Sequence, residues 1–67
     1  MEEKAVSEVR KIINELVKGG RVIVKQQIFD LARNEGIFEE DVIEILNHFI
    51  EEGTLVKQDE QTFEVPV

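Results

Sequence analysis

The spacing of apolar residues along the first two thirds of the chain is typical of helices. Apolar side chains recur every three or four positions, which places them on one face of a helix. This spacing predicts helices over residues 3–18, residues 25–34 and residues 39–52. A glycine follows each of them, and glycine readily adopts the left-handed backbone that commonly ends a helix. The chain is therefore expected to begin as three short helices joined by tight turns.

Two further segments carry the pattern of strands. Residues 21–24 contain a β-branched run that is too short for a helix, which predicts a strand between the first two helices. Residues 54–65 alternate apolar and polar side chains around a polar turn, which predicts a hairpin. Leu55 and Phe63 are expected to point inward from this hairpin.

The order of the predicted elements indicates the fold class. Helix, short strand, helix, helix and two-stranded hairpin is the α+β arrangement of a winged helix. The second and third helices would form the helix-turn-helix, and the hairpin would be the wing. Residues 1–67 then form a single domain. The alternative is a generic three-helix domain with a strand pair.

The hydrophobic core is expected to join all three helices to the wing. Six residues are predicted to lie at its centre: Ile12, Leu16, Leu31, Leu46, Phe49 and Leu55. In the second helix, Leu31 is expected to share the inward face with Ile28 and Ala32. Phe29 and Phe38 are expected to be partly exposed.

Composition limits the classes of protein that fit. A domain of 67 residues buries only about 60% of its extended surface, so its stability depends on a well-patterned core. The chain has no cysteine, which excludes disulfides and thiolate metal sites. No apolar run approaches the roughly 20 residues that span a bilayer, and the acidic start does not resemble a signal peptide. We therefore expect a cytoplasmic domain without membrane contact that is monomeric in isolation.

Charge is distributed unevenly between the two halves of the chain. Residues 1–33 carry a net charge of +2, whereas residues 34–67 carry −9, which together give −7. Nucleic acid is held by clustered Lys and Arg, whose contacts release counterions from the phosphates. The second half of the chain is therefore expected to contact something other than a phosphate backbone.

The third predicted helix would enter the major groove in a DNA-binding helix-turn-helix protein. Its outward positions are mostly acidic, although Asn47 has the amide that pairs with the edge of an adenine. Glu44 and Glu40 lie one and two turns before Asn47 and would face the phosphates, which disfavours the usual docking on DNA. Two interpretations remain, a solvated helix face or a contact with a protein. For the second, the candidate partner-binding residues are Glu40, Glu44, Asn47, His48 and Glu51.

Basic residues in and after the first helix are the candidates for a weak contact with nucleic acid. They are Arg10, Lys11, Lys18, Arg21 and Lys25. No aromatic residue is interleaved with them to stack on bases. They fit equally well as ordinary surface charges that balance Glu8 and Glu15.

The sequence does not assemble residues for catalysis, cofactor binding or metal binding. His48 is the only histidine, and with Glu44 and Glu51 it makes a poor zinc site. Ser7 is the only serine, and no second histidine is present to complete a nucleophile and base. The glycine pair before residue 21 lacks the pattern of a phosphate-binding loop. The chain is therefore expected not to be an enzyme and to need no cofactor or metal.

The stretch from Ile28 to Phe63 resembles a known family. Its motifs are Ile28-Phe29-Asp30-Leu31-Ala32, Gly36-Ile37, Val42-Ile43-Glu44-Ile45-Leu46 and Glu51-Glu52-Gly53-Thr54-Leu55-Val56, closed by the aromatic Phe63. They resemble the C-terminal winged helix of archaeal minichromosome maintenance (MCM) replicative helicases. That family tends to end its third helix with an acid-glycine pair, to continue with a short apolar strand and to close its wing on an aromatic residue. Its hairpin often carries Pro or Gly and a Tyr, where this chain has Gln58-Asp59-Glu60-Gln61 and Phe63.

The resemblance implies a parent protein and a function. The ATPase machinery would lie upstream, so the chain would begin inside a longer parent and end with it at Val67. The domain would be a mobile, non-catalytic module that modulates the helicase and is nucleoid-associated through its parent. It would contact the helicase motor domain or another replication factor, and bind DNA weakly or not at all. The alternative is a small winged-helix DNA-binding transcription regulator.

Overall fold

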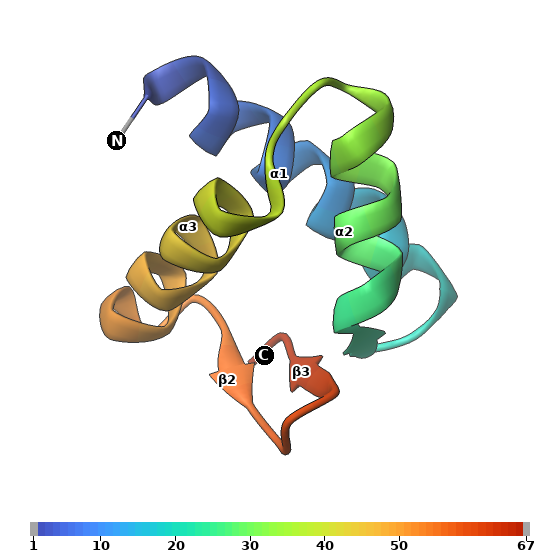
Figure 1. Ribbon diagram of the computed structural model, residues 1–67. Coiled ribbons are helices and arrows are strands. Elements are labelled where there is room, and N and C mark those ends of the chain that lie inside the picture. Colours follow the sequence, from blue (N-terminus) through green and yellow to red (C-terminus); the bar gives the residue numbers. More distant parts are fainter. Residues whose placement is uncertain (1, 67) are drawn as a thin grey trace.

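The computed structural model describes residues 2–66 and contains three α-helices and a small three-stranded antiparallel sheet. In chain order the elements are α1 (Glu3–Leu16), β1 (Val22–Val24), α2 (Lys25–Asn34), α3 (Glu39–Glu52), β2 (Val56–Lys57) and β3 (Thr62–Glu64). The β2–β3 hairpin lies beside the end of α3 and the start of α2 (Figure 1). The layout is α+β and is compatible with the expected winged-helix arrangement.

Glycine ends α2 and α3 as the sequence predicts. Gly53 follows α3 with a left-handed φ of +82°, and the next amide, that of Thr54, donates to the carbonyl of Phe49 at 3.0 Å. The Thr54 hydroxyl donates to the same carbonyl at 3.1 Å. Gly36 closes α2 in the same way with a φ of +79°. These bonds satisfy carbonyls that a helix end leaves without a partner.

The first helix and the strands are shorter than predicted. The α-helical part of α1 ends at Leu16, because Val17–Gly19 winds into a tighter 3₁₀ turn. The two hairpin strands contain two and three residues, and the turn between them is correspondingly longer.

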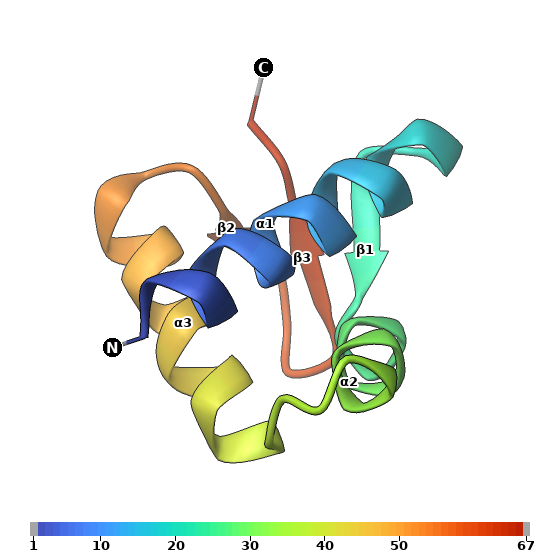
Figure 2. The ribbon, with the colours of Figure 1, turned by 90° about the horizontal axis from the view of Figure 1, so that it is seen from above.

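The first strand completes the sheet by pairing with the last one. The strand order is β1-β3-β2, so β3 lies in the middle (Figure 2). Ile23 of β1 stands opposite Phe63 of β3, and Phe63 in turn stands opposite Lys57 of β2. The amide of Lys25 donates to the carbonyl of Gln61 at 2.8 Å, which ties the start of α2 to the hairpin.

One hydrophobic core joins all three helices to the sheet. Its buried members are Val9, Ile12, Ile13, Ile23, Ile28, Phe29, Ala32, Val42, Ile45, Leu46, Phe49, Leu55 and Phe63. Four of the six residues predicted at its centre are therefore confirmed, and Leu16 lies half-buried at its margin. None of the helices in residues 2–66 has the length and apolar character needed to cross a membrane.

Two predictions about α2 are wrong. Leu31 is 39% exposed, whereas Phe29 is buried. Ile28 and Ala32 are buried as predicted, and both Leu31 and Phe29 lie next to them on the helix surface. The periodic pattern of α2 fits burial of either residue, and in the structure the core covers Phe29, whereas Leu31 lines an open groove between α1 and α2. Phe38, between α2 and α3, is exposed as expected.

Candidate functional site

The outer face of α3 carries the acidic strip, which we define as Glu40, Glu44, Asn47 and Glu51. With about 100° between successive residues of an α-helix, these four lie within about 60° of one another. The centre of the strip is about opposite the centre of the buried residues of α3, and all four side chains are exposed. The helix contains no Lys or Arg, so no basic residue of α3 neutralises the strip. The predicted outward positions are therefore brought together on one face.

His48 lies at the edge of the acidic strip, and its ring contacts two other residues of α3. Its Nε2 lies 3.3 Å from Oε2 of Glu52, one turn later. Its ring is tilted against that of Phe49, with the centroids 6.5 Å apart. The carboxylate beside His48 is thus that of Glu52, and not one of the two, from Glu44 and Glu51, that the sequence spacing suggested. His48 borders the strip and does not extend it.

Two of the five basic candidates for a nucleic-acid contact form ion pairs within α1 and the turn after it. Lys11 Nζ lies 3.5 Å from a carboxylate oxygen of Glu8. Lys18 Nζ lies 3.1 Å from a carboxylate oxygen of Glu15. The Lys18–Glu15 pair is exposed on both sides and contributes little to stability, whereas Glu8 in the other pair is half-buried. Arg21 is also exposed and precedes β1.

The other two basic candidates lie over aromatic rings of the core. The guanidinium carbon of Arg10 is 5.0 Å from the centroid of the Phe49 ring. Lys25 Nζ is 5.9 Å from the centroid of the Phe29 ring. Arg10 lines a hollow beside α1 and the end of the chain, whereas Lys25 lines one between α3 and the sheet. The five basic residues are therefore spread over several surfaces and do not form one patch.

The groove between α3 and the sheet holds a basic residue that the sequence reasoning missed. This groove has a volume of about 130 Å³, and Lys57 of β2 lines it together with Lys25, Ile43 and Asn47. A signal for Lys57 was present in the sequence. Because alternate residues of a strand share a face, Lys57 points to the same side as the inward Leu55. None of the residues that line this groove is acidic, although the acidic strip lies beside it.

Asp59 and Glu60 lie in the turn between β2 and β3, and Asp59 has a structural role there. Its Oδ1 accepts hydrogen bonds from the amides of Gln61 and Thr62 at 2.8 and 2.9 Å, and from the Thr62 hydroxyl at 3.0 Å. These bonds favour the charged carboxylate and lower the pKa of Asp59 below its usual value of 3.8, with the Gln61 amide as the largest cause. The other acid, Glu60, is exposed and lies 3.3 Å from Lys57 Nζ. The Asp59 carboxylate therefore forms its hydrogen bonds within its own turn.

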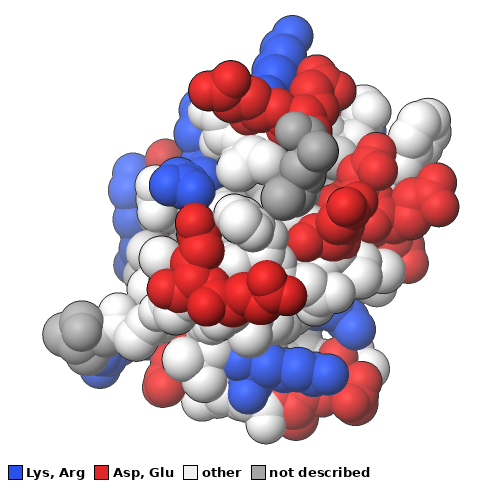
Figure 3. Space-filling view, turned by 90° about the vertical axis from the view of Figure 1, so that its left-hand side faces the viewer, with Lys and Arg blue, Asp and Glu red and all other residues white. Residues whose placement is uncertain are grey.

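Acidic residues dominate one side of the molecule. In the view from the left-hand side of Figure 1, Asp and Glu spread over much of the surface, and Lys and Arg lie mainly on its left and in its lower part (Figure 3). The charged groups are at the surface, since no polar or charged residue in the described part of the chain is buried. Such a surface attracts cations and basic groups and repels phosphates.

Residues 2–66 contain no group of three or more His, Asp or Glu side chains arranged to hold a metal ion. Comparison of the chain with protein-family models, with curated proteins and with solved structures finds no match.

Proposed function

We propose that this chain is a non-catalytic, regulatory winged-helix domain that docks a basic protein surface on the acidic strip of α3. The observation that carries the proposal is the position of the strip. Three carboxylates stand on one exposed face, opposite the core, on a helix without Lys or Arg. Complementary charge of this kind accelerates encounter and selects among partners.

The winged-helix assignment is supported by the element order and the sheet. In that interpretation α2 and α3 are the helix-turn-helix, β2 and β3 are the wing, and β1 pairs with β3 at the opposite edge. The acidic strip then lies on the helix that DNA-binding members of this architecture insert into the major groove. Its charge makes a protein partner the better fit.

The proposed parent is an archaeal MCM helicase, and the support for it is the sequence resemblance between Ile28 and Phe63. The regulatory partner would be the motor domain of that helicase or another replication factor. Deletion of the domain should then leave ATP hydrolysis intact and change the rate or the control of unwinding.

A second candidate function, a DNA-binding transcription regulator, is favoured by one observation. Lys25 and Lys57 line the groove where α3 meets the sheet, so this junction is not wholly acidic. Two lysines provide few phosphate contacts, however, and Glu40, Glu44 and Glu51 stand on the neighbouring face of α3. We therefore place DNA binding second.

Charge reversal tests the proposed function. The double variant Glu40→Lys with Glu44→Lys should reproduce the effect of deletion on unwinding and abolish the pull-down of the motor domain. The matched control is Glu3→Lys with Glu60→Lys, which makes the same change in net charge at exposed positions outside α3. If the Glu40/Glu44 double variant behaves like the wild type in both assays, the strip is only a solvated surface.

Titration of labelled duplex DNA separates the two candidate functions. At physiological salt the isolated domain should bind without sequence preference and with a dissociation constant no tighter than about 10⁻⁶ to 10⁻⁴ M. A nanomolar complex that depends on base sequence would reject the protein-docking proposal in favour of the DNA-binding one.

A further inference from the structure

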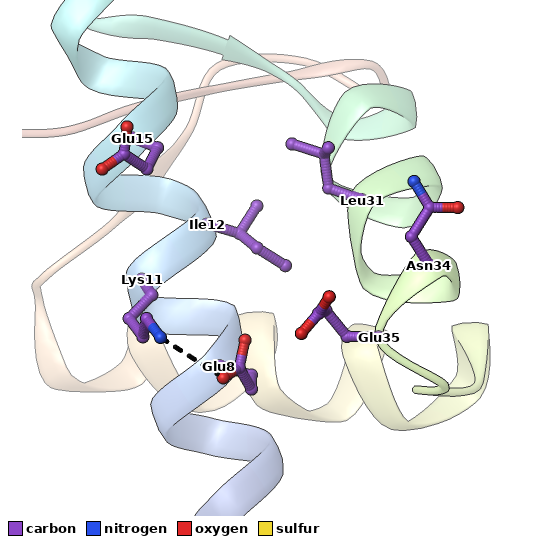
Figure 4. A pocket seen from close by; sticks show the side chains of 7 residues that line it. All are labelled: Glu8, Lys11, Ile12, Glu15, Leu31, Asn34 and Glu35. Carbon is purple, nitrogen blue, oxygen red and sulfur yellow. Dashed lines mark ion pairs between the residues drawn. The ribbon is translucent and has the colours of Figure 1, made fainter.

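An open groove of about 400 Å³ lies between α1 and α2, away from the acidic strip. Its apolar part is formed by Ile12 of α1 and Leu31 of α2, which point toward one another across it (Figure 4). Leu31 is 39% exposed, although the apolar pattern of α2 favours its burial. The α1–α2 groove thus leaves part of an apolar helix stripe without cover from the protein's own chain.

Carboxylates surround this apolar floor. Glu8 and Glu15 line the groove from α1, and Glu35 lines it from the end of α2. Lys11 is the one basic residue of the lining, and it forms a 3.5 Å ion pair with the half-buried Glu8. Glu35 forms no ion pair within residues 2–66, and in Figure 4 its carboxylate points toward α1. The lining therefore carries an excess of negative charge close to an exposed apolar surface.

A second hollow, of about 260 Å³, continues the surface beyond Glu35. It adjoins the first because Glu8 and Glu35 line both. It contains Phe38, which at 71% is the most exposed of the large apolar residues in the described part of the chain. Asp41 adds a further carboxylate to its edge. Exposed apolar surface with a polar rim is characteristic of sites where proteins interact.

We infer that the α1–α2 groove, extended to Phe38, binds a basic amphipathic segment of a partner protein. Apolar side chains of the segment cover Leu31 and Phe38, while Lys or Arg residues beside them face Glu8 and Glu35. The charge of the rim identifies this occupant, because carboxylates repel nucleic acid and acidic segments. A second copy of the chain, which carries a net charge of −7, is disfavoured for the same reason.

The experiment uses the full chain and a displayed library of random peptides of roughly 16 residues, long enough for about four helical turns. Selected peptides should carry apolar residues flanked by Lys or Arg. One selected peptide is then synthesised and titrated into the isotopically labelled protein. The amide signals that shift should be those near Ile12, Leu31, Glu35 and Phe38, and not those near Asn47 and Glu51 at the other end of the acidic strip.

Two variants and one matched control make the test specific. Leu31→Gln should weaken the peptide about tenfold or more, because it removes the apolar contact while keeping a helix-forming residue. Glu35→Lys should weaken it severalfold, and a lysine at a helix end is compatible with folding. Ile43→Gln is the control, since Ile43 is an apolar residue of similar exposure on α3, outside the groove.

Several outcomes overturn the inference. They are the absence of any peptide that binds more tightly than about 1 mM, selected peptides without basic residues, and shifted signals confined to α3 or the hairpin. Equal weakening by Leu31→Gln and Ile43→Gln would also reject it. A dimer of the chain that Leu31→Gln dissociates would assign the groove to a second copy instead. Because the strip variants Glu40→Lys and Glu44→Lys leave the groove intact, failure here is distinguishable from failure of the proposed function.

Discussion

The acidic strip of α3 and the α1–α2 groove are both rich in carboxylates, but they differ in what lies beside the charge. The centre of the strip is opposite the core, so its three carboxylates stand in solvent, and apolar side chains such as Ile43 lie only at its Asn47 edge. The groove lies between α1 and α2, and its carboxylates surround Ile12 and the exposed Leu31. Charge on an exposed face mainly speeds encounter with a partner and selects among partners. Covering an apolar surface with a partner instead stabilises the complex.

This difference follows from where each residue stands on its helix. The acids of the strip occupy the outermost positions of α3, which a folded domain leaves in water whatever it packs against. Leu31 occupies the edge of the apolar stripe of α2, where cover depends on a neighbouring element. We therefore expect the two surfaces to respond differently to substitution, to salt and to a bound partner.

The largest expected effect is the difference in free energy of unfolding between a core variant and a groove variant. Phe49→Ala should lower the free energy of unfolding by about 3–5 kcal/mol, because it removes a buried aromatic from the centre of α3. Leu31→Ala should lower it by only about 1 kcal/mol, because part of that side chain is already in water. Urea denaturation of the two variants measures this. Equal losses would show that the groove side of α2 is part of the core after all.

The kinetics of partner binding compare the two surfaces directly. Glu40→Lys with Glu44→Lys should slow association roughly tenfold at low salt, and the effect should shrink as salt screens the charges. Leu31→Gln should mainly accelerate the dissociation of the basic peptide from the α1–α2 groove, because it removes apolar contact that forms after encounter. Surface plasmon resonance at several salt concentrations measures both rates. The comparison fails if both variants change the same rate constant with the same dependence on salt.

A smaller effect is expected at Asp59, an acid that has partners in its own chain. Because its pKa is lowered in the folded state, its hydrogen bonds stabilise the protein above the pKa of the unfolded chain. That contribution is lost as pH falls below 3.8 through the lowered pKa of the folded state. Asp59→Asn should therefore reduce the melting temperature near neutral pH, and its difference from the wild type should narrow in acid. Glu60→Gln is the control, and a difference that does not change with pH would contradict this.

The smallest effect is expected in the acidic strip itself. Glu44→Ala should change the free energy of unfolding by less than about 0.5 kcal/mol, because the side chain is exposed and bears no buried contact. Thermal melts of this variant beside Phe49→Ala provide the measurement. If Glu44→Ala proved the more damaging of the two, the assignment of faces on α3 would be wrong.

The sequence by itself determined those features that depend on neighbouring residues. The ends of α2 and α3 were predictable because Gly36 and Gly53 each adopt a left-handed backbone, two residues after α2 and directly after α3. The acidic strip was predictable because it lies on the same helix as the apolar stripe that it opposes. The inward positions of Leu55 and Phe63 followed from the two-residue period of the hairpin.

Only the tertiary structure decided how these elements cover one another. The spacing of apolar residues assigns them to one face of a helix. It does not say which edge of that face will be covered by an element that is distant in sequence. Packing buried Phe29 and left Leu31 in the α1–α2 groove, so a residue predicted for the core became part of a candidate docking site. The pairing of β1 with β3 joined segments separated by two helices, and the same arrangement brought Lys25 and Lys57 into one groove. These outcomes depend on contacts between residues far apart in sequence, which no local pattern encodes.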